Sequence, residues 1–407
     1  MRVQRFISEL CILPNRASCS ENELKSAKYI WSALRRLNID ATIDQFKSQK
    51  RMTGELITIL SGFIAAIILS FYSPFSGFIF SLVALLLFWG HFSNRFKPVA
   101  RCFRRSTSWN VVGRMKEVSA THHIVISAHH DTARSGPLWN PARVQHFRLN
   151  FLLGFVLLLV LILLLLVKII LPASLFLNIL LFVFIAYSVI QIFMLFFSGY
   201  FSPLVQGASD NASGVAVVLD LAHKLAESPL QNINVWLVTT GSEEVGAVGM
   251  KAFIDQYLTE LTSHKTYFIN FDNVGGDRLH YYLGEGMLNL TRFSDELIKL
   301  AQEVATQETF KTVTPSTYRL AYTDAIVPAN RKFPTLLFLA TDEHDMIPHW
   351  HWTTDIFENV NFGTIEMASA FAFELLTKLD KKVKAEKDAA AIERMKQESI
   401  KTEEEAE

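Results

Sequence analysis

Four short apolar segments of the sequence are each followed by acidic residues or histidines. The segments are rich in β-branched and aromatic residues, which is typical of buried strands. Residues 124–128 precede His129 and Asp131, and residues 235–240 precede Glu243 and Glu244. Residues 267–271 precede Asp272, and residues 335–340 precede the loop that contains His351. In open α/β sheets, sites are built at the edge where the parallel strands end. The sequence therefore predicts that these side chains converge there.

A glycine-bounded segment, residues 207–214, places Asp210 just before a helix that we expect over residues 212–227. Free N–H groups at a helix start stabilise a carboxylate. Asp, Asn and Ser are also the usual N-cap residues, so the segment alone is compatible with an ordinary cap. The acidic residues and histidines on both sides of it in the sequence favour a functional carboxylate.

The order of these motifs resembles that of the co-catalytic di-zinc exopeptidases of clan MH, family 28. The matching motifs are His-x-Asp at 129–131, Gly-Ala-x-Asp-Asn-x-Ser-Gly at 207–214, Glu-Glu at 243–244, Asp at 272, and His-x-x-x-Asp at 351–355. The resemblance begins at residues 13–18 and covers most of the chain apart from two insertions and the C-terminal tail. It implies an α/β fold with a mixed, mainly parallel sheet flanked by helices.

The resemblance also implies a role for each matched residue. Asp210 would bridge two zinc ions. The terminal ligands would be His129, Glu244, Asp272 and His351. Glu243 would be the general base, and Asp131 would orient His129. Mn²⁺ or Co²⁺ would suit similar ligands.

The residue types suit this chemistry. Two zinc ions about 3.5–4 Å apart need a shared carboxylate, and the other ligands offer the N and O donors that zinc accepts. Open coordination positions leave room for a water whose pKa falls towards neutrality. Glu243 diverges from its neighbour Glu244, so it is free to take a proton from that water and pass it to the leaving amine. Asp131 can accept the second imidazole N–H of His129.

Several functions are compatible with this scaffold. We expect an aminopeptidase that hydrolyses N-terminal peptide bonds. The alternatives are a carboxypeptidase, a glutaminyl cyclase-like enzyme, and a non-catalytic membrane receptor or scaffold. The cyclases work with one zinc, and inactive relatives lose ligands or the base, whereas this chain keeps the whole set. Residues 322–325 depart from the Ser-Asp-His step of the family, because Ala325 replaces the histidine. This departure concerns substrate contacts and not a predicted ligand.

Two pairs of uncharged or nearly uncharged apolar runs interrupt the motifs. They are 56–72 with 75–92, and 151–171 with 174–197. Each is long enough to span a bilayer, so we expect four transmembrane helices in two inserted hairpins. The predicted organisation is peptidase-domain segments 1–53, 94–148 and 200–380, transmembrane hairpins 54–93 and 149–199, and a charged tail 381–407 in which a solvated helix frays into disorder.

Basic residues cluster near the open ends of both hairpins, while the tips carry Lys168 alone. The cluster consists of Lys47, Lys50, Arg51, Arg95, Lys97, Arg101, Arg104, Arg105, Arg134, Arg143 and Arg148. The positive-inside rule therefore predicts a multi-pass membrane protein with a cytoplasmic catalytic domain. Three cysteines without paired spacing suit a reducing compartment.

The expected partners are the lipid bilayer and a peptide substrate. Lysine plus arginine and aspartate plus glutamate both number 39, so the balanced charge does not indicate a nucleic-acid partner. The second hairpin lies between Asp131 and Asp210, so the predicted metals must be close to the bilayer surface. We therefore expect substrates held near the membrane, such as apolar peptides or the termini of membrane proteins.

Overall fold

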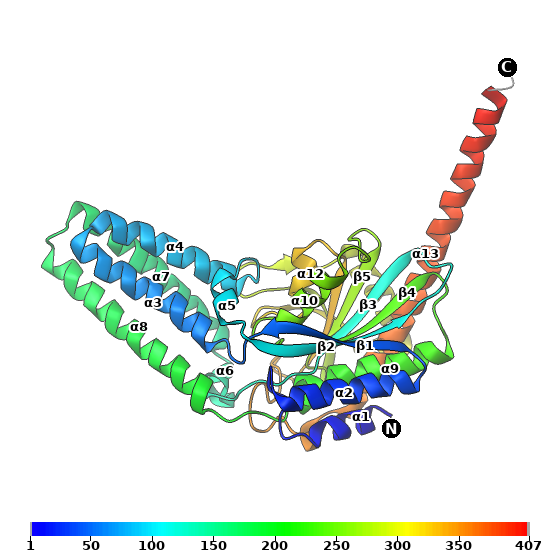
Figure 1. The fold of residues 1–407 in the computed structure, drawn as a ribbon, viewed down its shortest axis with the longest axis horizontal. Helices are drawn as coiled ribbons and strands as arrows, with labels where there is room; N and C mark the ends of the chain where they lie inside the picture. Colours follow the sequence, from blue (N-terminus) through cyan, green and yellow to red (C-terminus); the bar gives the residue numbers. More distant parts are fainter. Residues whose placement is uncertain (1, 405–407) are drawn as a thin grey trace.

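The protein has three parts, which Figure 1 shows in a computed structural model. The structure describes residues 2–404, and all their side chains except those of residues 394, 396 and 399–404. A central α/β domain carries a bundle of four long helices at one end. A single long helix, α13 (Phe362–Glu404), extends away from the other end.

A nine-stranded mixed sheet forms the centre of the α/β domain. The strands run in the order β1-β2-β4-β3-β5-β9-β6-β7, and β8 pairs with β6. Their bounds are β1 Asp40–Ser48, β2 Ser106–Met115, β3 His122–His129, β4 Ile233–Thr240, β5 Thr266–Phe271, β6 Arg278–Glu285, β7 Thr291–Arg292, β8 Thr314–Tyr318 and β9 Thr335–Thr341.

The four strands that were predicted to deliver the site are adjacent and parallel. They are β4, β3, β5 and β9, and their carboxyl ends therefore lie at one edge of the sheet. Antiparallel pairs flank them: β1 and β2 on one side, β6 and β7 on the other. The predicted fold class, a mixed α/β sheet whose centre is parallel, is confirmed.

Helices cover both faces of the sheet. One face packs against α1 (Arg2–Cys11), α2 (Glu21–Arg36), α9 (Gly214–Glu227), α11 (Asp295–Ala305) and α13, and the other packs against α10 (Val248–Tyr257) and α12 (Ile326–Asn330). Side chains alternate between the faces, as period-2 strands require. In β3, for example, Ile124 and Ile126 join the first core and Val125 joins the second. Burial on both faces explains why these strands are continuous apolar runs.

Apolar residues recur at helical spacing from Leu290 onward, but helix α11 begins only at Asp295. Ser294 is its N-cap, and the Ser294 hydroxyl accepts the backbone N–H of Leu297 at 3.4 Å. Residues 291–292 instead form β7, which pairs with β6. Leu290 and Phe293 therefore flank β7 rather than belonging to the helix, and the capping serine marks the start of α11.

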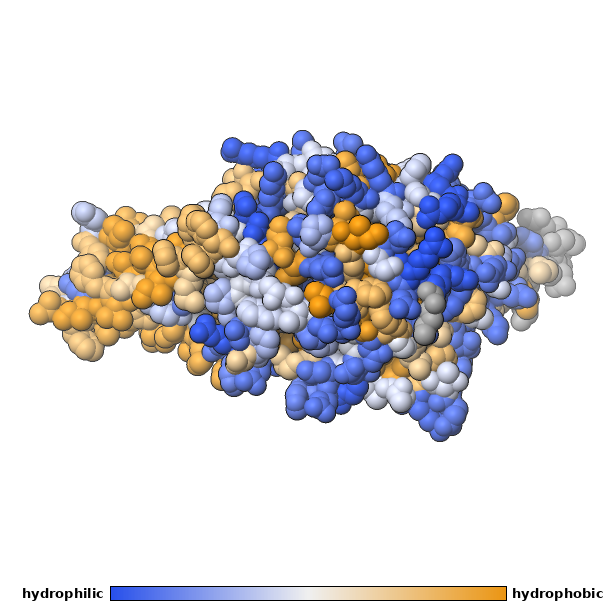
Figure 2. All heavy atoms as spheres, turned by 90° about the horizontal axis from the view of Figure 1, so that it is seen from below, coloured by the Kyte–Doolittle hydropathy of each residue, from blue (hydrophilic) through white to orange (hydrophobic). Residues whose placement is uncertain are grey.

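Four helices are long and apolar enough to cross a membrane. They are α3 (Thr53–Tyr72), α4 (Pro74–Phe92), α7 (Phe147–Ile170) and α8 (Leu175–Phe201), with mean hydropathies of 2.0, 1.8, 3.3 and 2.6. They pack against each other around Phe63, Leu161 and Leu181, while many of their large apolar side chains face outward. Figure 2 shows this end of the molecule as a continuous apolar surface. The pairs correspond to the two predicted hairpins, with α7 starting two residues before 149 and α8 ending two residues after 199.

Short helical segments complete the connections between these elements. They are α5 Pro98–Phe103, η1 Pro137–Trp139, α6 Pro141–Val144, η2 Ala208–Ser213, η3 Glu308–Phe310 and η4 Phe357–Asn359.

The C-terminal segment differs from the expectation of a disordered tail. Residues 381–404 continue α13, which has 43 residues. The physical reason is composition, because Ala, Glu, Lys, Arg and Gln have high helix propensity. Lys382 also lies 3.8 Å from Glu386 one turn later. The first turns of α13 are anchored in the main core through Phe371, Leu375 and Leu379. The solvated helix expected in this segment is present, and it continues to the last described residue, Glu404.

Candidate metal centre

The segment that carries Asp210 is a buried one-turn connection, η2, between the sheet edge and α9. Gly207 precedes it with φ +71°, a conformation that favours glycine. The Asn211 side chain ties the connection to β5, because its Nδ2 donates to the Phe271 carbonyl at 2.9 Å. Its Oδ1 accepts the backbone N–H of Gly214 at 2.9 Å and of Asn273 at 3.2 Å. Asp210 itself is 2% exposed and points into the site.

The two carboxylate oxygens of Asp210 face two different pairs of side chains. Oδ1 lies 3.2 Å from Nε2 of His129, and the same nitrogen lies 3.7 Å from Oδ1 of Asp272. Oδ2 lies 3.1 Å from Nε2 of His351, which lies 3.2 Å from Oε2 of Glu244. The structure thus brings together all five predicted ligands. It also groups them, with His129 and Asp272 on one side of Asp210 and Glu244 and His351 on the other.

The electrostatics of this cluster favour cations. Burial opposes ionisation of Asp210, but hydrogen bonds from His129 and His351 outweigh it and hold its pKa below the ordinary value. Burial likewise disfavours the imidazolium of His351, yet the charge of Glu244 and the contact with Asp210 raise its pKa to about 10. Burial raises the pKa of Glu244 to about 7. Carboxylates this close together need positive charge between them.

The residues present fit metal ions. One ligand atom each of His129, Asp210 and Glu244 lie within 4.8 Å of one another. Among the described residues, the buried Oε1 of Glu244 has no hydrogen-bond partner. Imidazole nitrogens and carboxylate oxygens are the donors that zinc prefers. Two imidazoles with raised pKa now supply the positive charge that bound cations would supply.

Comparisons with known proteins agree with this geometry. The sequence model described as peptidase family M28 matches residues 193–376, which contain four of the five ligands and Glu243. This match supports a relation to peptidase family M28 for the part of the chain that carries most of the site. A segment of 93 residues is 32% identical to the alkaline phosphatase isozyme conversion protein of Escherichia coli, covering 22% of this chain and 27% of that protein.

Solved structures share the fold of this chain. A zinc aminopeptidase from Bacillus subtilis superposes with a TM-score of 0.55 at 15% identity, covering 93% of this chain and 94% of its own. The glutaminyl cyclase of Porphyromonas gingivalis superposes with a TM-score of 0.53 at 13% identity, covering 93% and 97%. At these identities the likeness is one of fold.

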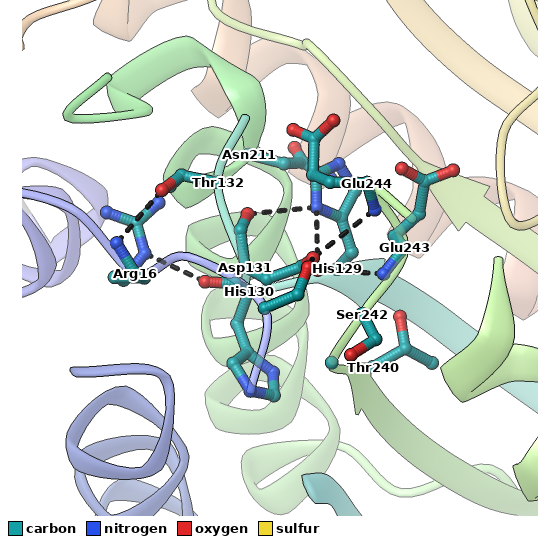
Figure 3. A network of polar contacts seen from close by, with 12 residues as sticks. Arg16, His129, His130, Asp131, Thr132, Asn211, Thr240, Ser242, Glu243 and Glu244 are labelled. Carbon is teal, nitrogen blue, oxygen red and sulfur yellow. Dashed lines mark hydrogen bonds and ion pairs between the residues drawn. The ribbon is translucent and has the colours of Figure 1, made fainter. Parts of the chain in front are cut away.

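Asp131 makes more contacts than its predicted role requires. The Nδ1 atom of His129 lies 3.5 Å from Asp131 Oδ1 and 3.1 Å from its backbone carbonyl, so Asp131 does lie beside the ring. Its carboxylate also accepts the backbone N–H groups of Glu243 at 2.9 Å and Glu244 at 3.2 Å, and the hydroxyl of Ser18 at 2.6 Å. Figure 3 shows Asp131 between these groups. One buried carboxylate thus positions three predicted functional residues.

Glu243 lies beside the ligands but outside the ion-pair cluster. Its side chain diverges from that of Glu244, as expected for neighbours in a turn (Figure 3). Burial raises its pKa well above the ordinary value, and the charges of Asp324 and Glu244 add to the rise. A carboxyl group whose pKa is raised in this way suits the exchange of a proton.

Arg16 connects the N-terminal segment to the site. Its guanidinium is fully buried and donates to the backbone carbonyls of His130 at 2.8 Å, Gln206 at 2.7 Å and Gly207 at 2.7 Å. It therefore joins the segments that carry His129 and Asp210. The resemblance at residues 13–18 indicated this region, but not this contact.

Sequence reasoning missed two further buried acids near the ligands. Asp324 accepts the hydroxyl of Thr240, and burial raises its pKa to about 7. Glu285 accepts both the backbone N–H and the hydroxyl of Thr323 at 3.0 Å, and burial raises its pKa well above the ordinary value. The sequence did draw attention to Asp324, because residues 322–325 depart from the Ser-Asp-His step of the family. Glu285 lies within β6, and its sequence context resembles that of any strand residue.

Two further histidines near the site, His130 and His349, lie outside the cluster. His130 is fully buried and follows β3, but its ring points away from the ligands in Figure 3, and burial lowers its pKa to about 3. The His349 ring nitrogen Nδ1 lies 2.7 Å from the Thr354 hydroxyl instead. Neither ring therefore takes part in the contacts around Asp210.

Asp355 is a support that the motif contained but that the prediction left without a role. Its carboxylate is 2% exposed and accepts the backbone N–H groups of Ser209 at 2.6 Å and Asp210 at 3.1 Å. It therefore holds the turn that presents the shared carboxylate. Supports behind a ligand tune metal affinity nearly as strongly as the ligands themselves.

We expect Asp355→Asn to weaken metal binding by about 10–100-fold, because an amide replaces one of the two acceptor oxygens with a donor. Competition with a chelator, read as metal retained per chain, measures this change. Asp345→Asn is the matched control, because Asp345 is 79% exposed and contacts only the surface residue Arg278 at 3.0 Å. Equal retention by both variants would show that Asp355 does not support the site.

Proposed function

We propose that this protein is a membrane-anchored, metal-dependent aminopeptidase that uses two zinc ions to hydrolyse N-terminal peptide bonds. The observation that carries the proposal is the division of ligands about Asp210. Each of its oxygens faces one histidine and one further carboxylate. A shared carboxylate with two terminal pairs is what a two-metal hydrolytic site requires.

The residues of the chain have separable tasks in this reaction. Bound metal ions would supply Lewis-acid polarisation and activation of the attacking water. Glu243 accepts a proton from that water and returns it to the leaving amine. Asp131 holds Glu243 in place through the backbone N–H bond at 2.9 Å. Arg16 and Asp355 hold the segments of the ligands, so that little reorganisation accompanies the reaction.

Charge favours an aminopeptidase over a carboxypeptidase. Acids dominate the site, including the buried Glu285 and Asp324. The two cations whose charges couple to the site are Arg16 and Lys97, and both are engaged. Arg16 binds three backbone carbonyls, and Lys97 binds the Gly246 carbonyl and the Tyr322 hydroxyl. A protonated α-amino group suits these surroundings better than a substrate carboxylate.

The alternatives predict different products from the same peptide. A glutaminyl cyclase-like enzyme, which the shared fold keeps open, would leave the peptide length unchanged. A carboxypeptidase would shorten the other end, and a receptor would leave the peptide intact. Incubation of the zinc-loaded protein with a peptide library, followed by mass analysis of both ends, therefore separates all four.

The site is close to the helices that we propose to be membrane-spanning. One arm of the chain leads from Asp131 to α7, and a second arm leads from α8 to Asp210. The two arms are hydrogen-bonded to each other, because the backbone N–H of Ser135 donates to the Pro203 carbonyl at 2.9 Å. The Trp139 ring packs edge-on against His351, with ring centroids 4.3 Å apart. It also stacks on Phe147, the first residue of α7, with ring centroids 5.1 Å apart. These contacts support substrates that approach along the bilayer surface, such as apolar peptides or membrane-protein termini.

Glu243→Gln should retain the metal ions but lower kcat by about 10²–10⁴-fold, since the amide cannot accept the proton. Release of the N-terminal residue from a peptide measures turnover. Glu303→Gln serves as control, because Glu303 is 60% exposed and pairs only with Lys378. Near-normal turnover of the Glu243 variant would show that another group is the base.

Metal content tests the shared carboxylate. The purified protein should hold two zinc ions per chain, and Asp210→Ala should lose both, because the only side chain common to both ligand pairs is removed. Elemental analysis after dialysis measures this, with Glu243→Gln as the variant that keeps both ions. A protein that holds one ion at full occupancy would contradict the two-metal proposal and favour the cyclase-like alternative.

The proposed orientation places Cys102 in the cytoplasm. Cys102 is exposed, whereas burial raises the pKa values of Cys11 and Cys19 to about 11 and makes these thiols less reactive. A membrane-impermeant maleimide should therefore label the protein only after the cells are opened. Ala173→Cys, at the exposed tip between α7 and α8, should be labelled in intact cells. Labelling of the unmodified protein in intact cells would reverse the orientation.

A further inference from the structure

Both ends of the α3–α4 pair contact the turn that carries Glu243 and Glu244. We call residues 243–247 the glutamate turn. It is closed by the Glu243 carbonyl, which accepts the backbone N–H groups of Gly246 at 2.7 Å and Ala247 at 2.8 Å. The carbonyls of Val245 and Gly246 remain for other donors. Both find them in residues that flank the α3–α4 pair.

Gln49, four residues before α3, supplies the first contact. Its side chain is 2% exposed, and its Nε2 donates to the Val245 carbonyl at 3.2 Å. The same amide nitrogen lies 3.4 Å from Oε2 of Glu55, in the first turn of α3. Gln49 is therefore shared between the glutamate turn and the start of a helix.

Glu55 in turn joins α3 to α4. Its Oε1 lies 2.7 Å from Nδ1 of His91, in the last turn of α4, and both side chains are 1% exposed. Buried polar groups of this kind hold their partners in one arrangement, because breaking the pair leaves a buried group unsatisfied. The two helix ends and Gln49 thus form one connected unit.

Lys97, five residues after α4, supplies the second contact. Its ammonium donates to the Gly246 carbonyl at 3.1 Å and to the Tyr322 hydroxyl at 2.9 Å. Burial lowers its pKa to about 8, and the charges of Glu55 and Glu243 act against that lowering. Tyr322 belongs to the segment where the sequence departs from the family pattern.

The glutamate turn is therefore held from two opposite directions. The carboxylate of Asp131 takes its first two N–H groups from the side of the sheet. Gln49 and Lys97 donate to its Val245 and Gly246 carbonyls from the side of the helix pair. Displacement of α3 and α4 would move these donors and, with them, the backbone of Glu243.

From this juxtaposition we propose that Gln49 and Lys97 are positioning residues, through which the α3–α4 pair sets the placement of Glu243. Turnover then depends on the position of that helix pair in the bilayer. The inference rests on the proposed function, because it assigns meaning to the placement of the general base. It deepens that function by giving the first hairpin a task beyond anchoring.

The test uses the full-length, zinc-loaded protein in lipid nanodiscs. Gln49→Leu and Lys97→Met should each lower kcat by about tenfold, since small misplacements of a reacting group have effects of this size. KM and zinc content should stay within about twofold, and Lys97→Arg should restore much of the loss because it keeps a charged donor. Lys50→Met is the matched control, because Lys50 is exposed beside Gln49.

A second measurement separates positioning from a general loss of stability. The unmodified protein should differ in kcat between nanodiscs and detergent micelles, and the double variant Gln49→Leu with Lys97→Met should lose most of that difference. Equal kcat for the double variant and the unmodified protein, or a change confined to KM, overturns the inference alone. Failure of the unmodified protein to release any N-terminal residue overturns the proposed function and this inference together.

Discussion

The arrangement of the site depends on a buried excess of negative charge around one side chain. Asp210 is 2% exposed, and the carboxylates of Asp272 and Glu244 lie beside the histidines that Asp210 contacts. Like charges at this separation raise each other's pKa unless cations lie between them. The imidazoles of His129 and His351 take that place in the metal-free chain, where neighbouring carboxylates raise their pKa values. Every other feature of the site serves to hold these groups in spite of their repulsion.

Buried charged side chains hold the segments of the site in place through hydrogen bonds to their backbone groups. Asp131 takes two N–H groups from the segment of Glu243 and Glu244, and Asp355 takes two from the segment of Asp210. Arg16 binds three carbonyls at the same edge. Hydrogen bonds that involve a charged group are stronger than neutral ones, and buried ones are costly to break. The segments that carry Asp210 and Glu244 are therefore fixed through their main chain, and the two carboxylates face the histidines.

Much of this could be predicted from the sequence, for reasons that particular residues show. Strands such as 235–240 are buried on both faces, so they appear as continuous apolar runs, and the acids and histidines after them stand out. The five ligands were found because each follows such a run or lies in a glycine-bounded turn. The supports were harder to find, because a backbone N–H that donates to Asp355 leaves no trace in residue types. Glu285 and Gln49 likewise acquire their partners only through folding.

The positions of the two helix pairs explain how they coexist with the sheet. The first pair connects β1 to β2, whose facing residues Ser48 and Ser106 are still in register. The second leaves and returns where the Val205 N–H donates to the Ala133 carbonyl. Each pair therefore departs and re-enters at one point, and the strand pairing does not change. Because β1 is parallel to β4 through β2, both points lie at the edge where β3, β4, β5 and β9 end. The apolar helices and the ligands must then share one end of the domain, which is why residues that flank α3 and α4 reach the turn of Glu243.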